Sequence, residues 1–210
     1  MDTSVGLLAR LHWLGHASFR LDGPPTIYFD PWRLKGRLPQ ADVILVSHDH
    51  HDHCSPDDVK RVSGPGTVIV ANATAAKKLR GDVRALRPGE RTTVGEVEIE
   101  AVPAYNVSKS YHPCQAGHVG FIVTVGGERL YFAGDTDRIP EMVDITCDVA
   151  LLPVGGTYTM DAAEAAAAAA DIEPRVAVPM HWGAGVAGTR DDAERFRSLY
   201  DGQVAILEAE

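Results

Sequence analysis

The sequence predicts an α/β protein of mixed α+β character, and three observations support this fold class. Apolar, β-branched runs typical of buried strands alternate with helix start signals through the first half of the chain. Short strand-like segments separated by glycine and proline turns indicate antiparallel pairs as well. The chain has 210 residues, 45% of them hydrophobic, so a single domain over residues 1–210 can bury a large core.

The elements are expected from local signals, taken in chain order. Turns at Gly15 and before Thr26 separate short strands and predict a meander at the edge of a sheet. Ser55 is an N-cap residue and Pro56 suits the first helical position, so a helix should begin directly after the histidine-rich stretch. The expected strands are 7–14, 18–21, 26–29, 42–46, 67–70, 83–86, 91–94, 97–102, 119–125, 129–133, 149–154, 175–179 and 204–207. The expected helices are 56–62, 74–79, 160–171 and 189–200.

Two of these helices rest on different evidence. The run over 162–170 is alanine apart from Glu164, and alanine has the best helix propensity. The helix over 189–200 has acidic residues near its start, and Phe196 and Leu199 are expected to form its buried stripe.

Composition narrows the classes of partner. The formal net charge is −9, from 20 Lys and Arg against 29 Asp and Glu, which disfavours nucleic acid but permits a small-molecule substrate, including an anionic one. No apolar run approaches the ~20 residues of a membrane span, and the start of the chain lacks a leader pattern. Three scattered cysteines do not predict a disulfide framework. We therefore expect a cytoplasmic protein without a membrane span, with its oligomeric state left open.

The most informative stretch is 48–53, which contains four of the nine histidines and two aspartates. It lies between a predicted buried strand and a capped helix, so rigid elements can hold its side chains in fixed geometry. Converging imidazoles and carboxylates are ligands for a divalent transition metal. His48 and His50 could bind one metal ion, and Asp52 with His53 could bind a second. A solvated histidine-rich turn is the alternative, but such turns usually lie in flexible tracts.

The pattern His48-x-His50-x-Asp52-His53 matches the His-x-His-x-Asp-His motif of the metallo-β-lactamase superfamily of metal-dependent hydrolases, and the resemblance extends over most of the chain. Residues 13–18 resemble the branch that contains the ascorbate-6-phosphate lactonases and the N-acylphosphatidylethanolamine phospholipases D. The resemblance implies a four-layer αββα sandwich, the metallo-β-lactamase fold. Three further matches lie in the family order, at Asp30, Asp135 and His181.

The resemblance also implies a centre with two metal ions, most simply zinc, although manganese, iron or nickel would suit the same ligands. Asp52 would in addition be catalytic, because it would orient the nucleophilic water. Asp30 would brace the histidine loop from behind the ligands. The implied ligands are His48, His50 and His112 for one ion, Asp52, His53 and His181 for the other, and Asp135 as the bridge.

The third ligand of the first ion is the point at which this chain departs from the pattern. Many relatives have a metal-binding histidine where this chain has Tyr105 and Asn106. His112 and His118 are the histidines within reach. The loop resembles a sub-branch pattern that favours His112, and His118 could instead be an ordinary residue at the entry to a strand.

Four other side chains are candidates with two readings each. His16 lies in the turn shared with the branch and should approach the site without being a direct ligand. Cys54 follows the histidines and could be a soft metal ligand, but His53 already occupies the motif position, so a bystander or a neighbour of the ligands is expected. Lys109 could anchor an anionic substrate or could be a solvated loop lysine. Tyr158 could reach the site as a hydrogen-bond donor or could pack at its rim.

The predicted function is that of a metal-dependent hydrolase in which a metal-bound hydroxide attacks a phosphorus or carbonyl centre. The branch resemblance suggests a small phosphate ester, phosphodiester or lactone as the substrate. Two alternatives remain: an iron-dependent redox enzyme on the same fold, and a metal-dependent binding or regulatory protein without turnover.

Overall fold

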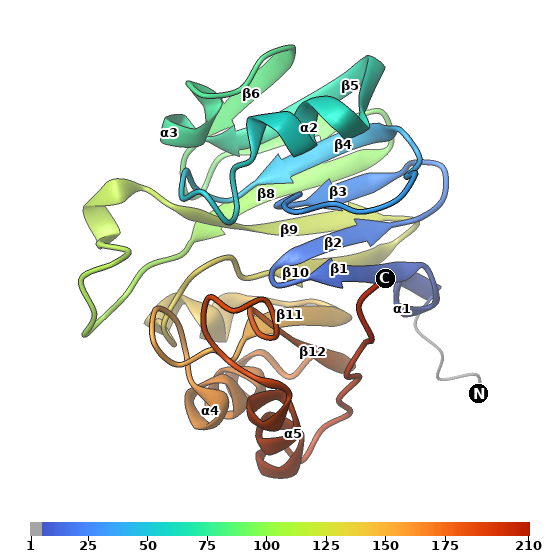
Figure 1. The fold of residues 1–210 in the computed structure, drawn as a ribbon. Helices are drawn as coiled ribbons and strands as arrows, with labels where there is room; N and C mark the ends of the chain where they lie inside the picture. The colour runs from blue at the N-terminus through green and yellow to red at the C-terminus, as the bar shows by residue number, and fades with distance from the viewer. Residues whose placement is uncertain (1–5) are drawn as a thin grey trace.

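The computed structural model describes residues 6–210 and contains two six-stranded sheets that pack against each other (Figure 1). The first sheet contains β1 (Leu11–Gly15), β2 (Ser18–Leu21), β3 (Ile27–Phe29), β4 (Ala41–Val46), β5 (Ser63–Asn72) and β6 (Asp82–Leu86), side by side in that order. The second contains β7 (Arg91–Val94), β8 (Val97–Pro103), β9 (Val119–Val125), β10 (Glu128–Phe132), β11 (Val149–Pro153) and β12 (Val176–Met180), also in sequence order.

Each sheet combines an antiparallel part with a parallel part, which confirms the mixed α/β class. Strands β1 to β3 and β7 to β10 are antiparallel neighbours, whereas β3 to β6 and β10 to β12 are parallel. Parallel neighbours end at the same edge of a sheet, so residues that follow β3 and β4, and those that follow β10 to β12, are brought together.

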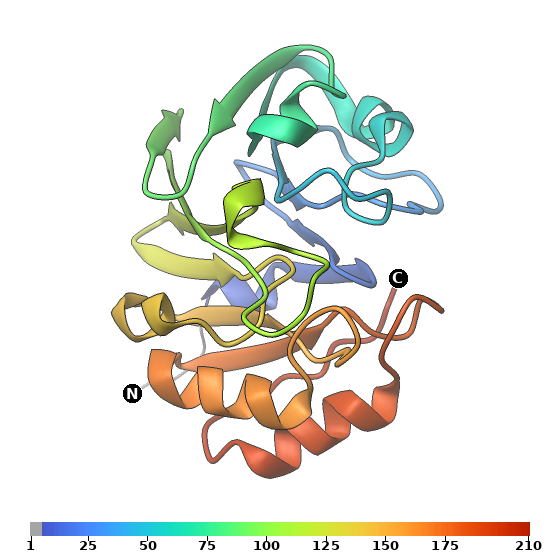
Figure 2. The same ribbon diagram turned by 90° about the vertical axis from the view of Figure 1, so that its left-hand side faces the viewer.

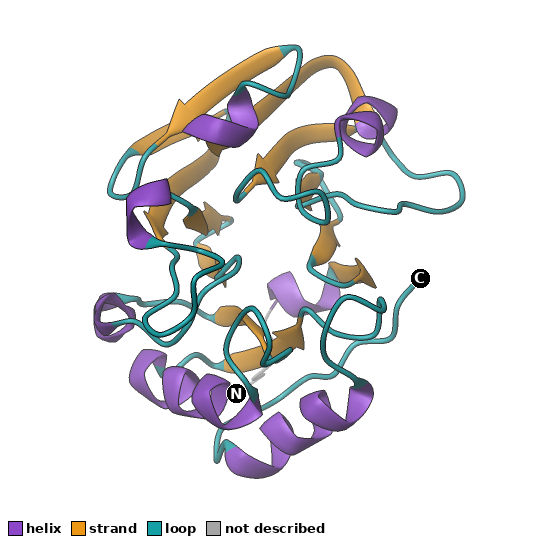
Figure 3. Ribbon diagram, turned by 60° about the vertical axis from the view of Figure 1, so that its left-hand side comes forward, coloured by secondary structure: helices purple, strands orange, loops and turns teal. Residues whose placement is uncertain are grey.

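The helices lie outside the two sheets, as Figures 2 and 3 show, and this confirms the αββα arrangement. Helix α2 (Pro56–Val62) and the short α3 (Ala73–Ala76) cover the first sheet, and α4 (Ala162–Ile172) and α5 (Arg190–Leu199) cover the second. The remaining helical segments are α1 (Gly6–Ala9) and the 3₁₀ turns η1 (Cys114–Ala116) and η2 (Pro140–Asp144). Among the described residues, no helix is long and apolar enough to cross a membrane.

The layers explain why residues 43–46 of β4 are all apolar. Val43 and Leu45 belong to the core between the sheets, whereas Ile44 and Val46 belong to the core beneath α2. A strand covered on both faces needs apolar residues at every position rather than at alternate ones. Ring contact between Phe29 and a phenylalanine of β10 joins the sheets, with centroids 5.4 Å apart.

Helix α2 has the bounds that the capping signals predict, because the Ser55 hydroxyl accepts a hydrogen bond from the Asp58 amide at the first turn. At the start of the chain, the strand expected from residue 7 is wrong in its first residues. Gly6 and Leu7 begin α1 instead, and both of their amides donate to the Glu128 carboxylate. That long-range contact could not be inferred from local sequence.

Three other expectations fail in detail. The strand expected over 67–70 begins earlier, because the glycine–proline segment at 64–66 lies within β5. Residues 204–207 form only an isolated bridge from Val204 to Ala177 instead of a strand. Leu199 is exposed at the end of α5, so Phe196 alone supplies the buried side of that pair.

Candidate metal centre

The predicted ligands meet at one end of the two sheets. The histidine loop 47–54 follows β4, Asp135 follows β10, and His181 follows β12 directly. His112 lies in the long segment between β8 and β9, which projects beyond the sheets in Figure 1. The structure therefore brings together predicted ligands from four separate loops, because the parallel strands end at this edge.

Among the described residues, three groups of side chains have their donor atoms within 4.8 Å of one another; the third, Asp30 with His48 and His53, shares its histidines with the other two, which are described next. One consists of His48, His50 and His112. The other consists of His16, Asp52, His53 and His181. These groups correspond to the two predicted metal positions, with His16 added to the second.

Asp135 lies between the two groups. Its Oδ2 is 3.3 Å from His112 Nε2, in the first group, and 3.3 Å from His181 Nε2, in the second. The same oxygen is 3.9 Å from His48 Nε2, while Oδ1 is 3.2 Å from His53 Nε2. One carboxylate is therefore within reach of both groups, as a bridging ligand would have to be.

Asp30 holds the histidine loop from behind. Its carboxylate accepts hydrogen bonds from the Ser47 amide at 2.7 Å and the Ser47 hydroxyl at 2.5 Å, and lies 2.7 Å from His53 Nδ1. This contact occupies Nδ1 of His53 and leaves its Nε2 facing Asp135. Burial raises the pKa of Asp30, although its contacts with His53 and Ser47 oppose that rise.

Asn106 occupies one of the two positions at which, by the resemblance, many relatives have a metal-binding histidine. Its side chain holds His112. Its Oδ1 accepts a hydrogen bond from the His112 amide at 2.9 Å and lies 3.1 Å from His112 Nδ1. Its Nδ2 donates to Asp137 Oδ1 at 3.0 Å and to the Tyr158 carbonyl at 2.9 Å. These four contacts fix which amide atom is oxygen and leave His112 Nε2 facing the site, where it lies 3.2 Å from His50 Nδ1.

The Lys109 side chain belongs to the contacts that position His112 and not to the surface of the metal site. Its Nζ lies 2.5 Å from Asp137 Oδ1 and 3.7 Å from Glu164 Oε2. Asp137 also accepts a hydrogen bond from the Val107 amide at 2.9 Å. The predicted anion anchor is therefore engaged in shaping the loop that carries His112.

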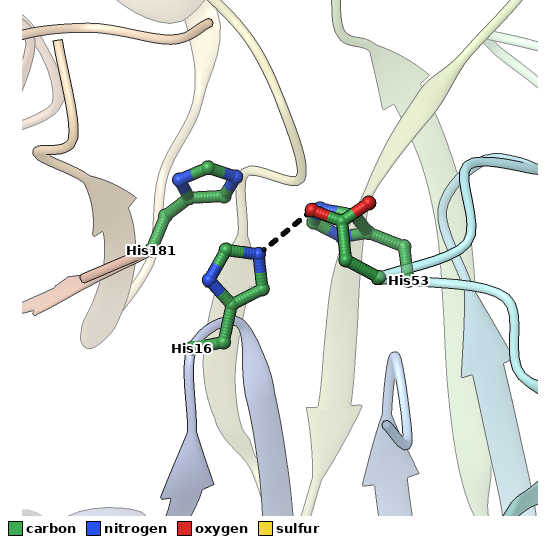
Figure 4. A group of neighbouring side chains, drawn as sticks. His16, His53 and His181 are labelled. Carbon is green, nitrogen blue, oxygen red and sulfur yellow. Dashed lines mark hydrogen bonds and ion pairs between the residues drawn. The ribbon is translucent and has the colours of Figure 1, made fainter. Parts of the chain in front are cut away.

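The structure gives His16 a larger part in the site than the sequence predicts. Its Nε2 lies 3.1 Å from Asp52 Oδ2, and the dashed line in Figure 4 marks this contact. Burial lowers the pKa of His16 to about 4. Burial would raise the pKa of Asp52, but the hydrogen bond with His16 lowers it overall, so this carboxylate stays ionised. The shared Gly15-His16 turn was the signal that could have identified it.

Backbone strain gathers at this centre. Residues His16, Asp30 and His181 have φ angles of 56°, 40° and 62°, in the left-handed region that favours glycine. The His181 amide also donates to the His16 carbonyl at 3.0 Å, so two of the strained residues support each other. Strain of this kind persists where the surrounding structure fixes a functional geometry.

His118 and Cys54 lie close to the ligands but outside both groups. The His118 ring packs against His48, with ring centroids 4.8 Å apart, and burial lowers the pKa of His118 to about 4. Cys54 is a free thiol in the core beneath α2, where burial raises its pKa to about 11. Protonated at neutral pH, this thiol is a packing residue.

The chemistry of the donor set fits transition metal ions. Among the described residues, His48 Nε2, His53 Nε2, both ring nitrogens of His181 and Asp135 Oδ1 are buried without an aligned hydrogen-bond partner. Unpaired buried polar atoms are costly and are rare in native structures. Burial also lowers the pKa of His48 and His50, which keeps these imidazoles in the neutral form that binds metal.

His53 supplies a second electrostatic argument. Burial alone would lower its pKa, but Asp135 and Asp30 raise it well above the usual value. Carboxylates that favour a positive charge at this position also favour a cation beside it. The geometry and the charge distribution therefore indicate the same kind of ligand.

A cavity of about 260 Å³ opens onto these groups. Tyr158, a predicted substrate contact, lines it, whereas Lys109 does not. The residues around it are His50, His51, Asp52, Tyr111, His112, Asp135, Tyr158 and Val186.

Comparisons with known proteins agree with this geometry. Residues 10–181 match the family model for a beta-lactamase superfamily domain. The chain is 38% identical to a UPF0173 metal-dependent hydrolase of Methanoculleus marisnigri, covering 82% of this chain and 80% of that protein. It is 32% identical to one from Thermoplasma acidophilum, covering 90% of each. A crystal structure of a metal-dependent hydrolase from Parabacteroides distasonis superposes with a TM-score of 0.85 at 36% identity, covering 95% of this chain and 93% of the other.

Proposed function

The chain belongs to the UPF0173 metal-dependent hydrolases of the beta-lactamase superfamily, and from this premise we propose that it hydrolyses a small phosphate ester, phosphodiester or lactone at a centre of two zinc ions. His48, His50 and His112 would hold one ion, and Asp52, His53 and His181 the other. Imidazole and carboxylate ligands support zinc, although they do not select it strongly over manganese, iron or nickel. The narrower resemblance to lactonases and phospholipases remains a prediction.

The observation that carries this proposal is the position of Asp135. Its carboxylate lies 3.3 Å from a nitrogen of His112 and 3.3 Å from a nitrogen of His181, which belong to different groups. Shared carboxylates of this kind hold two metal ions about 3.5–4 Å apart in hydrolases. A site for one ion would not need a buried carboxylate between two complete sets of ligands.

Two bound metal ions would supply a hydroxide nucleophile near neutral pH and would stabilise the charge that develops on the attacked group. The side chains of the protein have complementary tasks. His16 holds the Asp52 carboxylate at 3.1 Å, so that Asp52 can orient the attacking water towards the cavity. Asp30 and Asn106 fix the rings of His53 and His112 in the orientations described above.

A substrate panel tests the proposed function. Zinc-loaded protein should hydrolyse at least one of a phosphodiester, a phosphomonoester, a lactone and a thioester, and Asp52→Asn should lower kcat by about a hundredfold or more while the fold survives. Protein that holds metal but is inert towards all four would instead be a binding or regulatory protein. Bound iron with oxygen uptake would identify the redox alternative.

We also propose where the protein acts and what kind of partner it has. The three cysteines, at positions 54, 114 and 147, are all free, which supports the cytoplasmic location predicted from the sequence. The net charge of −9 supports a small molecule rather than nucleic acid as the partner.

A further inference from the structure

The cavity is lined by two kinds of residue. One kind is polar and consists of four predicted ligands, including the carboxylates of Asp52 and Asp135, together with His51. The other, which we call the apolar wall, consists of Tyr111, Tyr158 and Val186, which the proposed chemistry does not use. These residues come from three loops that are distant in sequence, so this apolar wall is a product of the fold.

The tyrosine pair at this wall has a defined geometry. The rings of Tyr111 and Tyr158 meet edge to face, with centroids 4.7 Å apart and an interplanar angle of 85°. Tyr111 is 48% exposed. It therefore retains ring surface that a bound molecule could cover, and aromatic surface of this kind binds flat apolar groups.

The basic side chains nearest the site are engaged elsewhere. Lys109 pairs with Asp137 and Glu164, and Lys78 Nζ lies 2.8 Å from Asp49 Oδ2. Arg33 lies over the Trp32 ring, 4.1 Å from its centroid, and donates to the Ala184 carbonyl. Within the described chain, no lysine or arginine lines the cavity.

A charged group placed against Tyr111, Tyr158 and Val186 would therefore lose water without contacting a basic side chain. It would face two phenol rings and an aliphatic side chain, and the carboxylates of Asp52 and Asp135 would partly balance the charge of the proposed metal ions. Burial of an unpaired charge in such surroundings is costly, whereas burial of an apolar group is favourable.

We propose that the substrate carries a flat, uncharged, apolar substituent, such as an aryl group, next to the bond that is hydrolysed, and that Tyr111 and Tyr158 select it. This inference rests on the proposed hydrolase function and narrows its substrate class. Small esters, lactones or phosphodiesters with an aryl or similar group fit the cavity lining, whereas molecules that carry a second charged group in place of the aryl group do not. The volume of about 260 Å³ suits a small molecule rather than a polymer.

The test measures binding of three carboxylates, which resemble products of ester hydrolysis, to zinc-loaded protein by isothermal titration calorimetry. Phenylacetate carries an aryl group, acetate lacks it, and 4-sulfophenylacetate has a similar ring with an added distal negative charge. We expect phenylacetate to bind about tenfold more tightly than acetate, and the sulfonate to lose this gain. Tyr111→Phe should keep the aryl preference, and Tyr111→Ala should reduce it about five- to tenfold.

Three results would overturn the inference: no binding of phenylacetate at millimolar concentration, tighter binding of the sulfonate than of phenylacetate, or an aryl preference unchanged in Tyr111→Ala. Because binding is measured without turnover, these results are distinct from a failure of the proposed function. Zinc-loaded protein that shows the aryl preference but hydrolyses no aryl ester, lactone or phosphodiester would contradict the function alone. With a substrate that is turned over, Tyr111→Ala should raise KM more than it lowers kcat.

Discussion

The two halves of the metal centre are built in different ways. The half that contains His53 and His181 stands on strand ends: His53 is braced by Asp30, which follows β3, and His181 directly follows β12. The half completed by His112 depends on a long segment between β8 and β9, whose position is set by side-chain contacts to Asn106.

On the proposed assignment, the fold replaces a ligand without changing the centre. The resemblance places a histidine directly after the strand, where this chain has Tyr105 and Asn106, and the Asn106 amide contacts His112, six residues further on. Asp137 and Lys109 extend the support by fixing the other side of the amide. The strand-end half needs one buried carboxylate for the same purpose, because its backbone is already rigid.

The largest expected effect distinguishes the two histidines near the first metal position. His112→Ala should weaken binding of one metal ion by about a hundredfold and remove most activity, because it deletes a donor at a position that has three. His118→Ala should change metal content and rate little, since its nitrogens lie outside the group. Metal content after dialysis and the rate on one substrate measure both variants. The reverse ranking would transfer the ligand role to His118.

Asn106 and Asp30, which position ligands, should affect metal affinity less than a ligand does, and each should affect a different ion. Asn106→Ala should lower affinity for the first ion about 10- to 100-fold while the second stays bound, and Asp30→Asn should do the opposite. Titration of each variant with zinc in the presence of a competing chelator resolves the two affinities. If Asn106→Ala leaves both affinities unchanged, the amide does not position His112.

The smallest expected effect concerns Lys109. Lys109→Met removes one partner of Asp137, but that carboxylate keeps its bonds from Asn106 and the Val107 amide. We therefore expect less than about a tenfold loss of affinity for the first ion, with unchanged KM for an uncharged substrate. Lys78→Met, which breaks the pair with Asp49, is the matched control. A large rise in KM confined to anionic substrates in Lys109→Met would restore its predicted role as an anion anchor.

The half of the centre that stands on strand ends is easier to predict from the sequence than the half that depends on His112. The loop after β4 follows from an apolar strand and a dense local motif, whereas Asp135 and His181 follow from the family resemblance, and parallel strands place their ends together. Asn106 and His16 act through contacts to residues 6 and 36 positions away, and such pairs leave no local pattern. The turn at 6–9 likewise depends on Glu128, which no local propensity indicates.

The most direct test of the shared centre is the metal content of protein purified without chelator, compared with that of Asp135→Ala. The account predicts close to two transition metal ions per chain in the wild type, because two complete groups flank one carboxylate. It also predicts that Asp135→Ala loses both ions together as chelator is raised. One ion per chain in the wild type, or a variant that releases one ion and keeps the other with its original affinity, would contradict the bridge.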